Sequence, residues 1–228
     1  MISGIQKTSL IEYPGKICTV LFTSGCNLRC PFCHNPDLVH NKAPKLDESE
    51  ILEFLEERKN WIDGVVITGG EPLIHADILD FIEKIKSKGF FVKLDTNGLN
   101  PAMLKKVIDS GYVDFFAMDI KSDKDHYSQA AGANINISMI DKSITLIKSQ
   151  DKPYEFRSTI VPEFFNYEVM ENIGKWLKGS KKYAIQQFRS SIPLLDKSFE
   201  GKPTLDLAHL NRFKDIMDNY VDEVVLRV

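Results

Sequence analysis

Residues 17–36 read ICTVLFTSGCNLRCPFCHNP and set both the architecture and the chemistry expected of this chain. Residues 17–23 are apolar or β-branched, and they predict a buried strand. Cys26, Cys30 and Cys33 follow with the spacing C-x3-C-x2-C. Thiolates are soft ligands that suit zinc, copper(I) and iron–sulfur clusters. The segment therefore predicts a metal site directly after a strand.

Two kinds of metal site fit these cysteines. Three thiolates can hold three irons of a [4Fe-4S] cube and leave the fourth iron open to a ligand. A structural zinc site instead closes with four ligands, and His34 is the candidate for the fourth. A disulfide scaffold is not expected, because all four cysteines lie in the first 33 residues of 228. Cys18 lies within the strand and is expected to be a buried small hydrophobe, with a redox or ligand role as the alternative.

Short apolar runs alternate with longer amphipathic runs along the rest of the chain. Further strands are expected at residues 64–68, 90–94, 113–117, 154–160, 183–188 and 223–228, and helices at residues 48–58, 76–88, 101–110, 137–149, 167–178 and 205–219. Near-continuous apolar strands separated by helices indicate parallel pairing. An eight-fold barrel usually needs about 250 residues, so we expect an α/β fold, an open partial (β/α)6 barrel.

The expected organisation is one domain over residues 1–228. Its loop 24–36 carries the metal site, and its C-terminal part, about residues 190–228, carries the least pattern.

The composition excludes several classes of protein. Of the 228 residues, 43% are hydrophobic and 27% charged, which is typical of a globular protein. The net charge, 29 − 32 = −3, argues against a surface built mainly for nucleic acid. No apolar run approaches the roughly 18–20 residues of a membrane span, and the N-terminus does not resemble a secretory signal. We therefore expect a soluble, cytoplasmic protein with no nucleic-acid or membrane partner.

Polar motifs follow the later strands, where α/β folds gather their functional groups. Residues 68–73 read TGGEPL, in which two glycines let a ligand approach the backbone and Glu71 can accept hydrogen bonds from an ammonium group. Asp95 and Asp119 follow the next two strands, and two carboxylates in one partly dry pocket need a cation between them. Lys121 is one source of that charge. His126 and Tyr127 are expected to lie in a surface helix turn, and the alternative is that they reach the pocket.

Arg157 alternates with apolar neighbours in the strand at residues 154–160, so its side chain is expected to face the barrel interior. It would pair there with Glu71 or with a bound carboxylate, or form a structural salt bridge.

These motifs resemble the radical S-adenosylmethionine (SAM) superfamily. The string GCNLRCPFCHNP at residues 25–36 is similar to its glycyl-radical-enzyme activating branch. Together with SLIEYPGKICTVLFTSGC at residues 9–26, it is most similar to anaerobic ribonucleoside-triphosphate reductase activating proteins. The resemblance covers nearly the whole chain. It is most specific in residues 9–39, 68–73 and 95–121, and thin after residue 165.

The resemblance implies that Cys26, Cys30 and Cys33 ligate a [4Fe-4S] cluster. Phe32 then shields the cluster, and His34 shapes the SAM pocket. The implied SAM contacts are Gly69, Gly70, Glu71, Asp95, Asp119, Ile120, Lys121 and Arg157, and the candidates for a monovalent cation site are Asp95, Thr96 and Asp119. Some activases carry a SAM-binding histidine that corresponds here to the neighbourhood of Asn172, so that contact is absent or replaced.

The resemblance also implies the reaction. A reduced cluster donates an electron to SAM, and the resulting deoxyadenosyl radical takes the Cα hydrogen of a glycine in a partner enzyme. The implied partner is anaerobic ribonucleotide reductase, with flavodoxin or ferredoxin as electron donor. The alternatives are activation of a pyruvate formate-lyase-type enzyme, a small-molecule radical SAM enzyme such as a 7-carboxy-7-deazaguanine synthase, and a zinc-binding interaction module.

Overall fold

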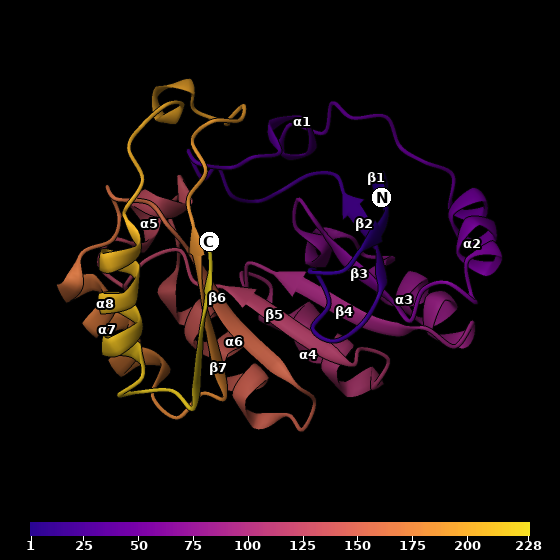
Figure 1. Ribbon diagram of the computed structural model, residues 1–228. Coiled ribbons are helices and arrows are strands. Elements are labelled where there is room, and N and C mark those ends of the chain that lie inside the picture. Colours follow the sequence, from indigo (N-terminus) through magenta and orange to yellow (C-terminus); the bar gives the residue numbers. More distant parts are fainter. The chain divides into compact units, whose positions relative to one another are not determined.

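The computed structural model describes residues 1–228 and divides into two compact units (Figure 1). Unit 1 comprises Met1–Asn27, Asp37–Ala117 and Ser149–Pro153, and unit 2 comprises Leu28–Pro36, Met118–Lys148 and Tyr154–Val228. The single domain expected over residues 1–228 stays a prediction.

Unit 1 is built on a sheet in which β1 (Ile2–Ser9) pairs antiparallel with β2 (Cys18–Thr23). β3 (Gly64–Gly69) and β4 (Phe91–Thr96) then add in parallel. β2 and β3 pair in register from their first residues to their last, so the loops that follow them leave from one edge of the sheet. That edge is where the sequence places the cysteine loop and the TGGEPL motif.

One face of this sheet carries a hydrophobic cluster of the core of unit 1. Its buried residues are Tyr13, Cys18, Val20, Val66, Phe115 and Ala117, with Phe22 packed against them. Cys18 is fully buried, and its thiol lies 3.5 Å from the carbonyl oxygen of Ser9. Burial raises the pKa of this thiol to about 11, so it is held as a neutral thiol. The prediction that Cys18 is a buried small hydrophobe is confirmed.

The helices of unit 1 follow its strands. α2 (Glu48–Glu57), α3 (Ile78–Ser87) and α4 (Pro101–Ser110) each bury an apolar face. α4 begins where predicted, because the Asn100 side chain caps it by accepting from the Met103 amide at 3.1 Å. The Asp47 carboxylate caps α2 in the same way. A short helix, α1 (Pro36–Val39), follows the cysteine loop, and a 3-10 turn, η1 (Pro72–Ile74), follows TGGE.

Unit 2 holds a parallel sheet of β6 (Tyr154–Ile160), β7 (Lys182–Gln187) and β8 (Glu223–Arg227). Its helices are α5 (Tyr127–Ala131), α6 (Ile137–Ser149), α7 (Tyr167–Leu177) and α8 (Leu207–Met217), with a 3-10 turn η2 (Lys197–Phe199). α7 and α8 pack side by side (Figure 1). Arg227 pairs with the fully buried Glu155 through two hydrogen bonds of 2.8 and 2.7 Å, which ties β8 to β6.

The predicted order of elements is confirmed. β5 (Phe115–Asp119) begins in unit 1 and ends in unit 2, and each strand from β2 to β7 is followed by a helix, which gives six β/α repeats along the chain. β1 was not predicted, because its residues Ile2–Ser9 mix polar and apolar types and its middle is exposed. The short α1 was also not predicted, whereas α5 begins at Tyr127, where a helix turn was expected. None of the helices combines the length and apolar character that crossing a bilayer requires.

Candidate functional site

In unit 1 the loop after β3 lies directly against the loop that carries Cys26. The Gly70 amide donates to the Thr23 carbonyl at 2.8 Å, and the Glu71 amide donates to the Gly25 carbonyl at 2.9 Å. A Cβ atom added to Gly70 would lie 1.9 Å from the Gly25 carbonyl oxygen. Only glycine therefore permits this approach, and Gly69 and Gly70 help to shape the backbone around Cys26.

The Glu71 side chain holds three neighbouring groups in place. It is 1% exposed, and its Oε1 accepts from the Leu73 amide at 3.1 Å and from Thr96 Oγ1 at 2.7 Å. Its Oε2 accepts from the Asn97 amide at 2.7 Å. The carboxylate thus joins the end of β3 to the end of β4. Its predicted contact with the SAM amino group stays a prediction.

Asn97 brings a polar group to the Cys26 thiol. Its Nδ2 donates to Asn27 Oδ1 at 2.8 Å and lies 4.0 Å from Cys26 Sγ. Amide donors near a sulfur ligand tune a metal centre, so Asn97, which the sequence alone presents as part of a plain turn, becomes a further candidate site residue. Its position directly after Asp95 and Thr96, at the carboxyl end of β4, was the available signal.

The two candidates for a monovalent cation site in unit 1 have partners within the chain. Asp95 is 4% exposed and accepts from Lys93 Nζ at 2.6 Å. The Thr96 hydroxyl donates to Glu71 and accepts from the Gly98 amide at 3.1 Å. The third candidate, Asp119, belongs to unit 2.

In unit 2 the segment after β7 is hydrogen-bonded to the loop that carries Cys30 and Cys33. Cys30 is buried and Cys33 is half-buried, and the Cys33 amide donates to the Cys30 carbonyl at 3.0 Å. The Leu195 amide donates to the Cys33 carbonyl at 2.9 Å, and the Asp196 amide donates to the Pro31 carbonyl at 3.0 Å. The C-terminal part of the chain, for which the sequence pattern predicts least, therefore binds the cysteine loop through backbone hydrogen bonds.

A second close approach fixes the start of this loop. The Arg29 amide donates to the Ala131 carbonyl at 3.0 Å, at the end of α5. Gly132 has φ +61°, and a Cβ atom there would lie 2.0 Å from the Arg29 carbonyl oxygen. Gly132 therefore does in unit 2 what Gly70 does in unit 1, although the sequence analysis did not identify it.

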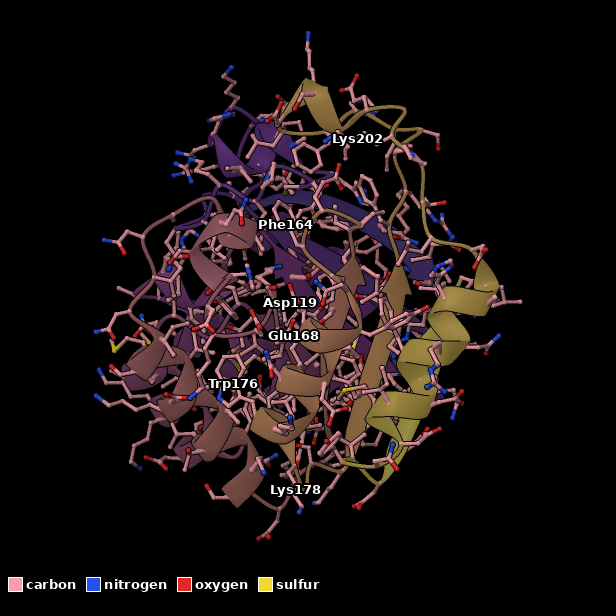
Figure 2. The ribbon with its side chains drawn as sticks, turned by 90° about the vertical axis from the view of Figure 1, so that its left-hand side faces the viewer. Asp119, Phe164, Glu168, Trp176, Lys178 and Lys202 are labelled. Carbon is pink, nitrogen blue, oxygen red and sulfur yellow. The ribbon has the colours of Figure 1, made fainter.

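Phe32 and His34 belong to the cysteine loop, and their implied roles toward the cluster and SAM stay predictions. Phe32 is 6% exposed, and its ring centroid lies 5.9 Å from that of Phe164, which stacks on Phe199 at 5.9 Å. The exposed His34 ring lies with Nε2 3.1 Å from the Arg189 carbonyl oxygen. Phe164 lies between Asp119 and Lys202 in the view of Figure 2. The Phe32 side chain thus buries the loop against the aromatic core of unit 2.

Three charged side chains of unit 2 meet at Asp119. Its Oδ1 accepts from Arg157 Nε at 2.6 Å, and its Oδ2 accepts from Lys121 Nζ at 2.9 Å. Burial alone would raise the pKa of Asp119, but the charges of Arg157 and Lys121 outweigh it and hold that pKa well below its usual range. Burial opposes the charge on Lys121, yet Asp119 and the Cys30 sulfur raise the pKa of that ammonium. Lys121 is therefore a permanent cation near Cys30.

The residues around this charged group are buried. Ile120 is fully buried, and its amide donates to the Arg157 carbonyl at 2.8 Å. Tyr127 is also fully buried, and its hydroxyl donates to the Asp119 carbonyl at 3.3 Å. The expectation of a surface turn at His126 and Tyr127 is wrong for Tyr127, because its ring packs edge-on against Trp176. His126 is half exposed.

Asn172 lies near the position that corresponds to the SAM-binding histidine of some activases, and its side chain is hydrogen-bonded. Its Nδ2 donates to Asp123 Oδ2 at 2.9 Å, and Asp123 Oδ1 lies 2.7 Å from His126 Nδ1. His126 in turn lines a cavity of about 80 Å³ together with residues 162–166 and Val169. The structure therefore places another histidine beside this position.

The donor set fits an iron–sulfur cluster. None of the three loop cysteines forms a disulfide, they lie within eight residues of one another in the sequence, and thiolates are the ligands that such a cluster requires. Cys26 belongs to unit 1, and Cys30 and Cys33 belong to unit 2. The structure brings no three His, Cys, Asp or Glu side chains together in a ready-formed metal site.

A family model described as the radical SAM superfamily matches residues 20–177. A protein of Methanocaldococcus jannaschii named "putative glycyl-radical enzyme activating enzyme" is 34% identical over 236 residues, covering 100% of this chain and 95% of that protein. A pyruvate formate-lyase-activating enzyme of Clostridium pasteurianum is 34% identical over 138 residues, which cover 58% of this chain and 57% of that enzyme.

Solved structures share the fold. SuiB of Streptococcus suis, bound to SAM, aligns with a TM-score of 0.68 at 14% identity, over 92% of this chain and 52% of SuiB. A domain of a pyruvate-formate lyase-activating enzyme from Bacteroides vulgatus aligns with a TM-score of 0.57 at 16% identity, over 72% of this chain and 99% of that domain. The predicted α/β fold, an open partial barrel, is confirmed, and the chain spans about half the length of SuiB.

Proposed function

Because the chain belongs to the radical SAM superfamily, we propose that it installs a glycyl radical on anaerobic ribonucleoside-triphosphate reductase. As a member of this superfamily it is an enzyme that uses a [4Fe-4S] cluster and SAM. The similarity to the Methanocaldococcus jannaschii protein along the full chain supports activation of a glycyl-radical enzyme. The choice of the reductase as partner rests on the resemblance of residues 9–39.

The cluster would be held by Cys26, Cys30 and Cys33. Asn97 would stand beside Cys26, and Phe32 would keep water away from the loop. When bound, the cluster would supply one electron to SAM. Cleavage of the S–C5′ bond would then give methionine and a 5′-deoxyadenosyl radical, and this radical would take a hydrogen atom from glycine Cα.

The observation that carries the proposal is the charged group at Asp119, whose Lys121 ammonium is stabilised by the charge of the Cys30 sulfur. Lys121, Asp119 and Arg157 form a partly exposed row in which a carboxylate stands between two cations. The methionyl end of SAM carries an ammonium and a carboxylate, so it matches a row that offers both signs of charge. In this proposal Lys121 and Arg157 hold the SAM carboxylate, Asp119 holds its ammonium, and the buried Ile120 fixes the backbone between them.

The backbone around Gly69 and Gly70 would complete the hold on the SAM amino group. These glycines leave the end of β3 without side chains, and Gly70 is fixed against the Cys26 loop. A ligand can therefore approach the main chain closely at this point. His34 would border the pocket from the far end of the cysteine loop.

The electron would come from flavodoxin or ferredoxin. The chain has four cysteines, and Cys18 is buried among apolar residues of unit 1. The remaining three serve one cluster, so a second cluster has no ligands and the electron must come from another protein.

The test is anaerobic reconstitution with iron and sulfide, followed by reductant, SAM and the reductase. We expect brown protein, cleavage of SAM and a glycyl-radical doublet in the EPR spectrum of the reductase. The variant Cys26→Ala should abolish the doublet, and the matched control Cys18→Ala should keep it. SAM cleavage without a doublet on the reductase would reject this partner, and colourless, zinc-containing protein would reject the enzyme.

One alternative partner has a specific observation in its favour. The Clostridium pasteurianum enzyme matches more than half of this chain, so a pyruvate formate-lyase-type enzyme is the second candidate. Incubating the reconstituted protein with either partner in parallel decides between them, because only the true partner gains the doublet. A 7-carboxy-7-deazaguanine synthase of Aquifex aeolicus is 38% identical over 74 residues, and turnover of a pterin without any protein partner would favour that activity.

A further inference from the structure

We infer that Lys93 is a built-in cation that gives Asp95 the positive charge a bound K⁺ or Na⁺ would otherwise supply. The chain then needs no monovalent cation at the end of β4. This inference concerns unit 1 alone and holds whichever protein is the partner, so it goes beyond the proposed function.

The geometry places both charges inside the unit. The Lys93 side chain is 1% exposed and the Asp95 side chain 6% exposed, and Nζ lies 2.6 Å from Oδ1. The two residues are two apart in β4, so they project from the same face of the strand. In the register with β3, Lys93 stands opposite Val66, a member of the apolar core of unit 1. The Lys93 ammonium also lies 6.0 Å from the centre of the Phe115 ring.

A buried carboxylate in such surroundings needs a cation. Taking an unpaired charge out of water is costly, so buried carboxylates are paired with a basic group or coordinate a metal. Asp95 and its neighbour Thr96 offer the oxygen atoms that a monovalent cation prefers. Here the Lys93 ammonium stands at hydrogen-bond distance from Asp95, and the Thr96 hydroxyl is engaged with Glu71.

The pair is a poor device for holding the fold together. Lys93 and Asp95 belong to the same strand, so their ion pair joins no two elements, in contrast to the bond between Glu71 and Thr96. A buried ion pair is also weak as a source of stability, because its desolvation offsets its attraction. Its clearest effect is therefore to fix the charge and the direction of Asp95 at the carboxyl end of β4.

The experiment compares SAM binding by the anaerobically reconstituted protein in K⁺ and in choline, together with ²⁰⁵Tl NMR and the melting temperature of the protein without cluster. The wild-type chain should bind SAM equally in both salts, melt at the same temperature in both, and show no specific Tl⁺ signal. Lys93→Met keeps the length of the side chain and removes its charge. It should bind SAM at least tenfold more tightly in K⁺ than in choline, melt higher in K⁺ and bind Tl⁺.

Two further variants complete the test. Lys93→Met combined with Asp95→Asn removes both charges and should lose the cation dependence again. Lys105→Met breaks the exposed pair of Lys105 with Asp109 and should behave like the wild type. Specific Tl⁺ binding or a K⁺ requirement in the wild-type chain would overturn the inference, whether or not Lys93→Met folds. A folded Lys93→Met chain that is indifferent to K⁺ would overturn it as well.

Discussion

Carboxylates in the two units have different surroundings. In unit 1, Glu71 is 1% exposed and accepts hydrogen bonds from three groups of its own chain. In unit 2, the Asp119 side chain is 27% exposed and is bound by two cationic side chains, Arg157 and Lys121. The first carboxylate is used to fix backbone, and the second stays open to solvent with charges on both sides.

This difference separates scaffolding from binding. Removing a buried carboxylate leaves its donors without partners, which costs stability. Removing a partly exposed carboxylate costs less stability but changes the charge offered to a ligand. Variants in unit 1 should therefore act mainly through folding and cluster retention, and variants at Asp119 mainly through the binding of SAM.

The largest effects are expected where glycine allows two backbones to meet. Gly70→Ala would place Cβ 1.9 Å from the Gly25 oxygen, and Gly132→Ala would place it 2.0 Å from the Arg29 oxygen. Backbone atoms cannot yield as a flexible side chain can, so each change should cost about 3 kcal/mol of unfolding free energy or more. Both variants should also lose most of the iron bound after reconstitution, measured by iron and sulfide analysis.

Two alanine substitutions serve as controls for these clashes. Gly111 has φ +72°, and a Cβ atom added there would meet nothing within 4 Å, whereas one added to Gly4 would meet only Phe22 at 3.4 Å. Gly111→Ala tests backbone strain alone, and Gly4→Ala tests an ordinary contact. Both variant proteins should bind as much iron after reconstitution as the wild type. Equal loss of iron from Gly111→Ala and Gly132→Ala would show that the close approach to Arg29 is unimportant.

The next largest effect is expected for Glu71→Ala. It leaves the amides of Leu73 and Asn97 and the hydroxyl of Thr96 without their buried acceptor. The unfolding free energy in urea should fall by about 2–3 kcal/mol. Glu53→Ala, an exposed helix position, should change it by less than about 0.5 kcal/mol. If Glu71→Ala kept wild-type stability but lost affinity for SAM, the prediction would be wrong, and Glu71 would be a binding group, as Asp119 is.

Asp119→Asn should show the opposite balance. We expect SAM affinity, measured by titration calorimetry, to fall at least tenfold while the unfolding free energy falls by about 1 kcal/mol. Because the folded pKa of Asp119 is depressed, its ion pairs stabilise the chain fully above its unfolded pKa of about 3.9, and that contribution is lost as pH falls through the lower folded value. The stability difference between wild type and variant should stay constant from pH 8 to 5 and shrink below about pH 4. A difference that shrinks between pH 7 and 5 would contradict this assignment.

The smallest effect is expected at His75, whose Nε2 lies 2.8 Å from the Ser24 carbonyl oxygen beside the cysteine loop. Burial lowers the pKa of His75, so the folded chain holds it neutral while the unfolded chain protonates first. Stability should therefore fall as pH drops from about 6.5 through the lower folded value, by under about 1 kcal/mol. In urea titrations, His75→Gln should lack this dependence and the exposed His40→Gln should keep it. A steeper dependence in His75→Gln would be the contrary result.

The sequence predicts the repeats well because each is a local pattern. α4 and α6 have the expected bounds, since Asn100 caps the first and a regular apolar stripe marks the second. The three cysteines and the TGGEPL motif are likewise read from spacing alone. β1 was not predicted, because an edge strand with an exposed middle shows no clear alternation of apolar and polar residues.

What the sequence could not give is the set of contacts between distant residues. Gly132 matters because Arg29 lies against it, and Asn97 matters because Cys26 is its neighbour. The partners of Glu71 and Asp95 also depend on which strands stand side by side. Nothing in the spacing of Lys93 and Asp95 tells whether the pair is buried, because its neighbours, among them Val66 and Phe115, come from other strands.

The most direct test of the central claim, that three cysteines hold an iron–sulfur cluster at which SAM binds, is the low-temperature EPR spectrum of the reduced, reconstituted protein with and without SAM. We predict a [4Fe-4S]⁺ signal whose g values change when SAM is added, and no such signal when Cys26, Cys30 and Cys33 are all replaced by alanine. A signal whose g values do not change on addition of SAM, or a signal that is still present in the triple alanine variant, would contradict the claim.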